Sequence, residues 1–261
     1  MSGGWTTIEK ARRQPGLRLV VTAGVPGPWG ESAKGVLHVR GVPFAKVPQH
    51  GGGPNDDLVD WTGESNAPQA IYEDERARSG WSEIIMLAER LGQGDSLLPE
   101  DAADRAQMFG LIHELASEGG FGWSRRLMLL APIMSLPEDH PARATFGAMA
   151  MRYGFDAGLA EAAPARAALV VGLIRDQLRS QHEAGSEFLI GDHLSALDVY
   201  WAAFAALIQP LPEDVCDMPA GLRASYATMH PLLDAAVDPI LLEHRDRIYE
   251  QYLEMPLDLA P

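Results

Sequence analysis

The stretch "FLIGDHLSALDVYWAAFAALI" (residues 188–208) passes from a polar turn into ten residues without a charge. Ser195 and Asp198 stand at the boundary with the spacing of a capping box, in which each side chain bonds to the other residue's backbone N–H. A helix that is apolar on every side is buried, so water cannot satisfy its first N–H groups. The stretch therefore predicts a buried helix over 196–209 whose own side chains close its start, a cap that contributes about 1–2 kcal/mol.

Length and composition predict a globular protein. The chain has 261 residues, of which 46% are apolar, so it can bury the core of one large domain or two ordinary ones. The apolar run after Asp198 is shorter than the roughly 20 residues that cross a bilayer, and no other stretch comes closer. The N-terminal segment lacks the continuous apolar core of a secretory signal. We therefore expect a cytoplasmic protein that makes no membrane contact.

Charge and residue usage exclude several classes of partner. A net charge of −15 disfavours nucleic acid, which rewards clustered Lys and Arg. The sole cysteine, Cys216, excludes an intramolecular disulfide framework and a cysteine-based zinc site. The eight histidines are scattered, so no metal site is expected. The triplet His-Arg-Asp at 244–246 lies in a helical pattern and is interpreted as solvated helix.

The order of predicted elements changes near residue 95. The first ninety residues alternate strands and helices, which is typical of a small α/β domain. The predicted strands are 17–22, 42–45 and 69–73, the predicted helices are 29–40 and one opened by Ser82, and 50–57 ("HGGGPNDD") is loop. Beyond Leu98 only helical patterns follow, starting at 99–101 and covering roughly 123–134, 141–153, 165–182, 196–209 and 239–253. An α/β domain is thus followed by an all-helical domain, joined near 92–97.

With the capping box in its helical part, this arrangement resembles the cytosolic glutathione transferases. That family has a cis-proline after the second helix of a thioredoxin-like domain and a Glu/Gln-Ser pair about a dozen residues later. Asn66-Ala67-Pro68 matches the first feature, and Ser82 matches the second, with Trp81 in place of the acid or amide. The segment "GPWGESAKGVLHVRGVPF" (27–44) is similar to the family's first helix and second strand. The resemblance, over about 17–255, implies a thioredoxin-like glutathione-binding domain at 16–93 and an all-helical domain with a hydrophobic substrate pocket at 98–261.

The resemblance also implies a glutathione site. Ser82, at a helix N-terminus, would hold the γ-glutamyl carboxylate, because free N–H groups and the helix dipole favour an anion there. A cis bond between Ala67 and Pro68 would leave the Ala67 backbone to pair with the cysteinyl part like an added strand. The alternatives are an ordinary helix cap at Ser82 and an ordinary turn at Pro68. Trp29 and Trp81 are assigned to the same site, with Trp29 either packing over the ligand or capping the first helix.

Activation of the thiol has no assigned residue. The pKa of a cysteine thiol is about 8.5, so a hydroxyl donor or a positive helix end must favour the thiolate at neutral pH. The family places Tyr, Ser or Cys at the first helix, where this chain has Gly-Pro-Trp-Gly at 27–30. Thr22 comes too early, Ser32 lies too deep, and Glu31 would oppose a thiolate. Two functions stay open: a glutathione S-transferase, or related lyase or isomerase, acting on a small apolar electrophile, and a non-catalytic binding or assembly protein.

The segment "GFGWSRRLMLLAPIM" (120–134) is expected to line the substrate pocket. Trp123 and Met128 would supply apolar surface, and Arg125 or Arg126 would receive an acidic group; we assign Trp123 and Arg126. The alternative is a core helix with two solvated arginines.

The resemblance further implies a homodimer in which each α/β domain packs on the partner's helical domain. Apolar side chains that the subunit's own core does not need, and that could form the dimer interface, are expected at Met108, Phe109, Ile112 and 128–130.

Overall fold

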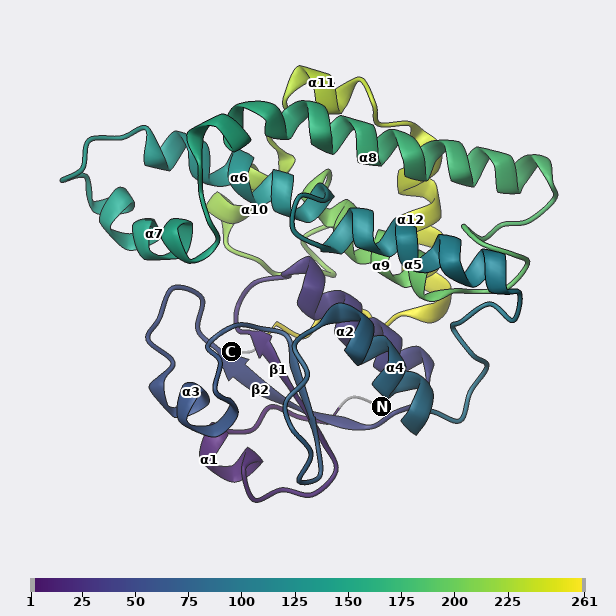
Figure 1. The fold of residues 1–261 in the computed structure, drawn as a ribbon, viewed down its shortest axis with the longest axis horizontal. Coiled ribbons are helices and arrows are strands. Elements are labelled where there is room, and N and C mark those ends of the chain that lie inside the picture. Colours follow the sequence, from purple (N-terminus) through teal and green to yellow (C-terminus); the bar gives the residue numbers. More distant parts are fainter. Residues whose placement is uncertain (1–2, 260–261) are drawn as a thin grey trace.

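The computed structural model describes residues 3–259, which form a small α/β domain beneath a larger helical one (Figure 1). The lower domain contains β1 (Leu17–Thr22), β2 (Phe44–Gln49), β3 (Gln69–Tyr72), α1 (Ile8–Ala11), α2 (Pro28–Val39), α3 (Asp56–Thr62) and α4 (Trp81–Leu91). The upper domain contains α5 (Ala102–Ala116), α6 (Phe121–Met134), α7 (Pro141–Arg152), α8 (Ala157–Glu183), α9 (Ala196–Phe204) with the 3-10 turn η1 (Ala205–Leu207), α10 (Ala220–Ala227), α11 (Pro231–Asp234) and α12 (Pro239–Tyr252). The predicted class, α/β followed by all-α, is confirmed.

The sheet has the order β2-β1-β3, with β1 parallel to β2 and antiparallel to β3. Side chains alternate between its faces, as the pleat requires. Leu17, Leu19 and Val21 join the large core that includes α2 and α4, whereas Val20 joins a smaller cluster with Leu58 of α3. Helices therefore cover both faces of the sheet, and β1 is buried at its centre.

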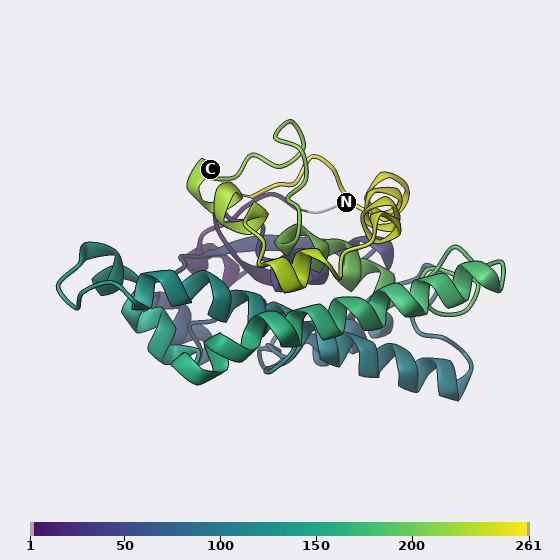
Figure 2. The ribbon, with the colours of Figure 1, turned by 90° about the horizontal axis from the view of Figure 1, so that it is seen from above.

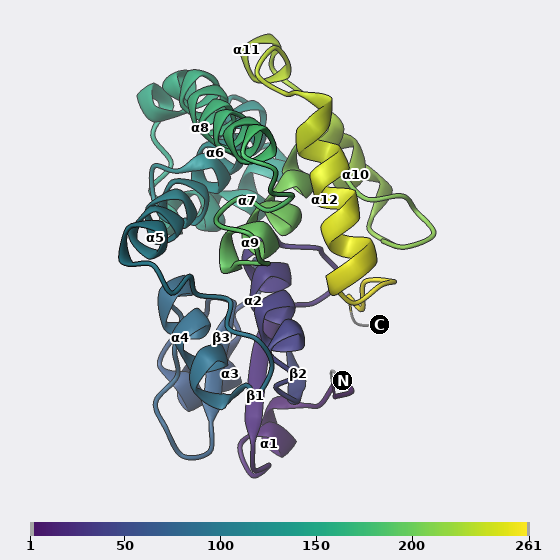
Figure 3. The same cartoon turned by 90° about the vertical axis from the view of Figure 1, so that its right-hand side faces the viewer.

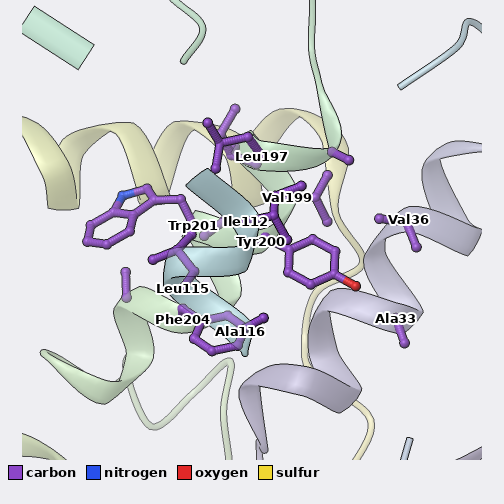
Figure 4. Close-up of a cluster of buried hydrophobic side chains, with 14 of the residues drawn as sticks. Ala33, Val36, Ile112, Leu115, Ala116, Leu197, Val199, Tyr200, Trp201 and Phe204 are labelled. Atoms are coloured by element: carbon purple, nitrogen blue, oxygen red, sulfur yellow. The ribbon is translucent and has the colours of Figure 1, made fainter. Parts of the chain in front are cut away.

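Helix α9 is the link between the two domains. All nine of its residues are buried, as the charge-free stretch predicts. It lies on α2 below and between α5 and α12 at its sides (Figure 3). Figure 4 shows Ala33 and Val36 of α2 near Val199 and Tyr200, so one apolar core crosses the domain boundary. Helices α2 and α9 approach each other closely at Gly35. A Cβ atom on Gly35 would lie only 2.6 Å from Val199 Cγ1.

The predicted capping box at Ser195 and Asp198 is confirmed. The Ser195 N–H donates to Asp198 Oδ2 at 2.8 Å, and the Ser195 hydroxyl donates to the same oxygen at 2.7 Å. The other oxygen, Oδ1, accepts from the Leu189 N–H at 2.8 Å and lies 3.0 Å from His244 Nε2. The carboxylate is fully buried, so it joins the turn before α9, the start of α9 and α12.

Three predictions about local structure are wrong. The segment 50–57 is not all loop, because α3 begins at Asp56 and is bounded by two left-handed residues, Asn55 and Gly63. The helix predicted over 165–182 is α8, which begins at residue 157 and continues through Pro164. His244 and Arg245 lie in a helix as expected, but both are buried and not solvated.

Helix α8 also corrects the expectation about membrane-spanning stretches. It is 27 residues long, and by length and composition alone it could cross a membrane. Figure 2 shows it running along the helical domain. One side of α8 packs into the core against α6, α11 and α12. Its buried residues are Ala163, Ala167, Val170, Val171, Ile174 and Leu178.

Both ends of the described chain fasten onto the α/β domain. Near the start, the Gly3 N–H donates to Phe44 O at 2.7 Å, and Trp5 forms a parallel bridge with Lys46 of β2. Beyond α12 the chain turns back to the lower domain (Figure 3), where Asp258 accepts from Trp5 Nε1 at 2.7 Å and pairs with Lys46. The helical domain is thereby tied to the sheet by a second connection besides the 92–101 linker.

Candidate functional site

Four segments meet at the carboxyl end of β1. The chain leaves β1 through residues 23–27 and enters α2, while the parallel strand β2 ends with Gln49 beside Thr22. The pairing of Val20 with Gln69 brings Ala67-Pro68 to this end. The antiparallel bridge between Ala70 and Arg78 then carries the chain back toward the same level, where α4 begins. The fold thus brings the predicted cis-proline loop and the predicted serine helix beside the start of α2.

The peptide bond between Ala67 and Pro68 is cis, as the resemblance predicts. Two buried glutamines hold the preceding loop: Gln69 Nε2 donates to Asn66 O at 2.7 Å, and Gln49 Nε2 donates to Ser65 O at 3.2 Å. Within residues 3–259 neither the N–H nor the C=O of Ala67 makes a hydrogen bond. The Ala67 backbone is therefore positioned and open to a ligand.

The N–H groups of the first three helical residues of α4, Trp81, Ser82 and Glu83, have no acceptor within residues 3–259. Its N-cap is Gly80 and has no side-chain bond, so Ser82 is the second helical residue and not the cap that the alternative proposed. No residue between 3 and 259 hydrogen bonds to the Ser82 hydroxyl. Glu83 is paired with Arg76, whose hydrogen bond is the main reason that the pKa of Glu83 is lowered. The first N–H groups of α4 and the Ser82 hydroxyl can thus bind an anion.

Trp81 takes a different direction from Ser82. Its Nε1 donates to Ser117 Oγ at 2.9 Å, and its ring lies 6.0 Å from Phe109 and 6.2 Å from Tyr200, between centroids. The Trp81 side chain is therefore a contact with the helical domain, and only its backbone N–H remains near the predicted glutathione site.

Trp29 packs at the domain boundary. Its Nε1 donates to Ala116 O at 2.7 Å, and its ring meets Phe204 edge to face at 5.1 Å between centroids. The N-cap of α2 is Gly27 and makes no side-chain bond. Trp29 therefore does not cap α2, and its packing over a bound ligand stays a prediction.

The two hydroxyl groups that the sequence offers beside the start of α2, those of Ser32 and Thr22, both bond within the protein. Ser32 is buried, and its hydroxyl donates to Pro28 O at 2.8 Å. The Thr22 hydroxyl donates to Gln49 Oε1 at 2.9 Å. Glu31, expected to oppose a thiolate, forms an ion pair with Lys34 at 2.8 Å, beside Tyr249 and Leu253. What remains is the positive end of α2, where the N–H groups of Trp29 and Gly30 have no acceptor within residues 3–259.

The two neighbouring arginines of α6 have opposite environments. Arg125 is buried and structural: its Nε donates to Leu207 O at 2.9 Å and its Nη2 to Tyr226 O at 3.0 Å. Arg126 is half-buried, and its Cζ lies 3.9 Å from the ring centroid of Tyr153 and 4.4 Å from that of Trp29. The prediction of two solvated arginines is wrong for Arg125.

Trp123 completes the ring cluster around Arg126. Its centroid is 5.2 Å from Arg126 Cζ, and it meets Tyr153 edge to face at 5.9 Å. Trp123 and Arg126, predicted to line one pocket, lie side by side in the structure. Tyr153 was missed, because it follows α7 and no local pattern connects it with α6.

No protein-family model matches the sequence, and no curated protein matches it significantly. Solved structures do match. A glutathione S-transferase domain-containing protein from Marinobacter aquaeolei is 16% identical with a TM-score of 0.62, over 91% of this chain and 100% of that one. The nitrogen regulation fragment of the yeast prion protein Ure2p is 13% identical with a TM-score of 0.63, over 91% and 93%. A glutathione S-transferase from Methylobacterium radiotolerans, in complex with glutathione sulfonate, is 14% identical with a TM-score of 0.61, over 90% and 91%.

These similarities establish the fold. The chain has the glutathione S-transferase fold, a thioredoxin-like domain followed by a helical domain, as the sequence predicts.

Proposed function

We propose that this protein binds glutathione on its α/β domain and presents the thiol to a small, largely apolar electrophile between the two domains. The observation that carries the proposal is the convergence, at the carboxyl end of β1, of three groups that have no hydrogen-bond partner within residues 3–259. These groups are the Ala67 backbone, the start of α4 with Ser82, and the start of α2. The fold is shared with a glutathione S-transferase solved with glutathione sulfonate, which supports the assignment.

Each segment has a separate task in this proposal. Ser82 and the first N–H groups of α4 hold the γ-glutamyl carboxylate, and the Ala67 backbone pairs with the cysteinyl part of the peptide. Bound glutathione supplies a thiol nucleophile. The N–H groups of Trp29 and Gly30 and the dipole of α2 favour its ionised form, because a helix N-terminus lowers the pKa of a thiol. The hydroxyls of Ser32 and Thr22 bond within the protein, so the proposal assigns this task to backbone groups.

Calorimetry with glutathione tests the binding step. We expect Ser82→Ala to weaken binding by about 1.5–3 kcal/mol, the usual contribution of a hydrogen bond to a charged group. Ser225→Ala is the matched control, because Ser225 is exposed on α10 in the other domain and bonds only to its own helix at Gly221 O. Equal affinities in wild type and Ser82→Ala would remove Ser82 from the site.

A second candidate is a binding or assembly protein that performs no conjugation. The observation that favours it is that the hydroxyls of Ser32 and Thr22 both bond within the protein, so neither is free to activate a thiol at α2. The similarity to the nitrogen regulation fragment of Ure2p is in keeping with this candidate. Binding to immobilised glutathione without conjugation of chlorodinitrobenzene would favour a binding protein. Neither activity would favour an assembly protein.

We also propose a homodimer, although not through the side chains first expected. Met108 and Ile112 are buried inside the subunit, so they are not spare. A dimer would instead bury exposed apolar side chains such as Met86 of α4, which is 44% exposed, and Met151 of α7, which is 76% exposed. A cytoplasmic location and the absence of nucleic-acid and membrane partners stay predictions.

A further inference from the structure

Arg126 is a cation without an anionic partner. Within residues 3–259 its guanidinium forms no ion pair and donates no hydrogen bond to a carbonyl or carboxylate, in contrast to Arg125 one residue earlier. Burial lowers the pKa of Arg126, although a guanidinium stays charged at neutral pH. A partly desolvated charge without a counter-ion is unfavourable, and an anion that binds beside it offsets that cost.

The surrounding rings determine how this cation can be used. Tyr153 and Trp29 lie within stacking distance of the guanidinium, and Trp123 is slightly further away. Rings stack on the faces of a guanidinium and leave its N–H groups in the plane, where they can form two parallel bonds to a carboxylate. Arg126 is only half-buried, whereas Arg125 is buried. The cluster therefore combines a guanidinium that can donate two parallel hydrogen bonds with the aromatic rings of Trp29, Trp123 and Tyr153.

The cluster lies beside the proposed thiol position. Trp29 is the second residue of α2, the helix whose first N–H groups face the thiol in the proposed function. Its ring contacts both Arg126 of α6 and Phe204 of α9. A molecule held by Arg126 would thus lie at the domain boundary, near the start of α2.

We propose that Arg126 is the residue that selects the electrophile, and that the substrates are aromatic compounds bearing a carboxylate. This inference rests on the proposed function for the identity of the nucleophile, but the binding of the carboxylate does not depend on glutathione. The guanidinium of Arg126 donates hydrogen bonds to the carboxylate of the substrate, while Trp29, Trp123 and Tyr153 contact its aromatic ring.

Two unreactive probes that differ only in the carboxylate test this inference: 3,5-dinitrobenzoate and 1,3-dinitrobenzene. Both quench tryptophan fluorescence, so affinity can be measured by titration without glutathione. We expect wild type to prefer the benzoate by at least about tenfold, in line with one charge-assisted hydrogen-bonded pair. Arg126→Gln should abolish that preference, and Arg126→Lys should retain part of it. Arg105→Gln, an exposed position on α5, is the control and should behave as wild type.

The result that overturns the inference is equal affinity for the two probes in wild type, or a preference that survives in Arg126→Gln. Circular dichroism checks that the variants are folded, and Arg126→Lys decides the question if the glutamine variant is not. Rates with 4-chloro-3,5-dinitrobenzoate and 1-chloro-2,4-dinitrobenzene give a second readout. If Arg126→Gln slows both equally and moves the pH profile upward, the guanidinium acts on the thiolate and the inference is overturned. Failure of the proposed function would instead appear as no heat of glutathione binding.

Discussion

Replacing Asp198 with alanine should destabilise the protein by about 3–5 kcal/mol, since burial makes this helix cap more important than an exposed one. The carboxylate accepts hydrogen bonds from the N–H groups of Leu189 and Ser195 and from the Ser195 hydroxyl, and it contacts the His244 ring. Its removal leaves two buried backbone donors and a buried ring nitrogen without their partner. Each buried polar group without a partner costs about 1–3 kcal/mol. Ser195→Ala removes only the hydroxyl and should cost about 1 kcal/mol.

Asp198→Asn separates shape from hydrogen-bonding capacity. The amide oxygen of asparagine can still accept from Ser195, but its NH2 group would then face the Leu189 N–H, a donor against a donor. We expect a loss of about 2 kcal/mol or more despite the nearly identical volume, because a buried donor is left without a partner.

Urea unfolding at equilibrium, followed by circular dichroism, measures these losses. The matched control is Asp101→Ala, because Asp101 caps α5 on the surface and accepts from the N–H groups of Ala103 at 2.8 Å and Asp104 at 3.0 Å. That exposed cap should contribute about 1 kcal/mol. If Asp198→Ala loses no more than Asp101→Ala, the reasoning that burial increases the contribution of the cap is refuted.

Three further predictions concern packing and assembly. Gly122→Ala should cost about 1–3 kcal/mol by overpacking, because a Cβ would lie 2.5 Å from Phe204 Cε1 and 2.9 Å from the Trp29 ring; Gly110→Ala, with nothing within 4 Å, should cost nothing in the same urea melts. Arg125→Met should lose about 2–4 kcal/mol by leaving buried carbonyls without a donor, and an unfolding midpoint equal to that of wild type would contradict this. Light scattering should give a mass of about twice 28.3 kDa, and a single-subunit mass at low and moderate salt would exclude the dimer.

The features that were predicted correctly from the sequence are local ones. The capping box depends on residues three positions apart, and β1 on a run of β-branched residues bounded by turns. The short helix α3 was missed because glycines and a proline precede it, although Gly63 was available as a C-terminal signal.

Long-range contacts account for what the sequence did not reveal at the site. Nothing near His244 indicates that it meets Asp198, 46 residues away. Arg125 and Arg126 are adjacent and chemically identical, and only the carbonyls of Leu207 and Tyr226 assign one of them to structure. Ser82 differs from an ordinary cap because Gly80 is the N-cap of α4 and the helix begins at Trp81, which the sequence pattern does not indicate.

The pairing of the first described residues with β2 protects the protein from aggregation. A three-stranded sheet has two outer strands, and an outer strand with free N–H and C=O groups can pair with a strand of another molecule. On β2 those groups are already used, since Thr6 donates to Lys46 O at 2.9 Å and Gly3 donates to Phe44 O. Residues 3–6 thus cover the outer edge of β2. Deleting them would leave the backbone N–H and C=O groups of β2 free to pair with a strand of another molecule.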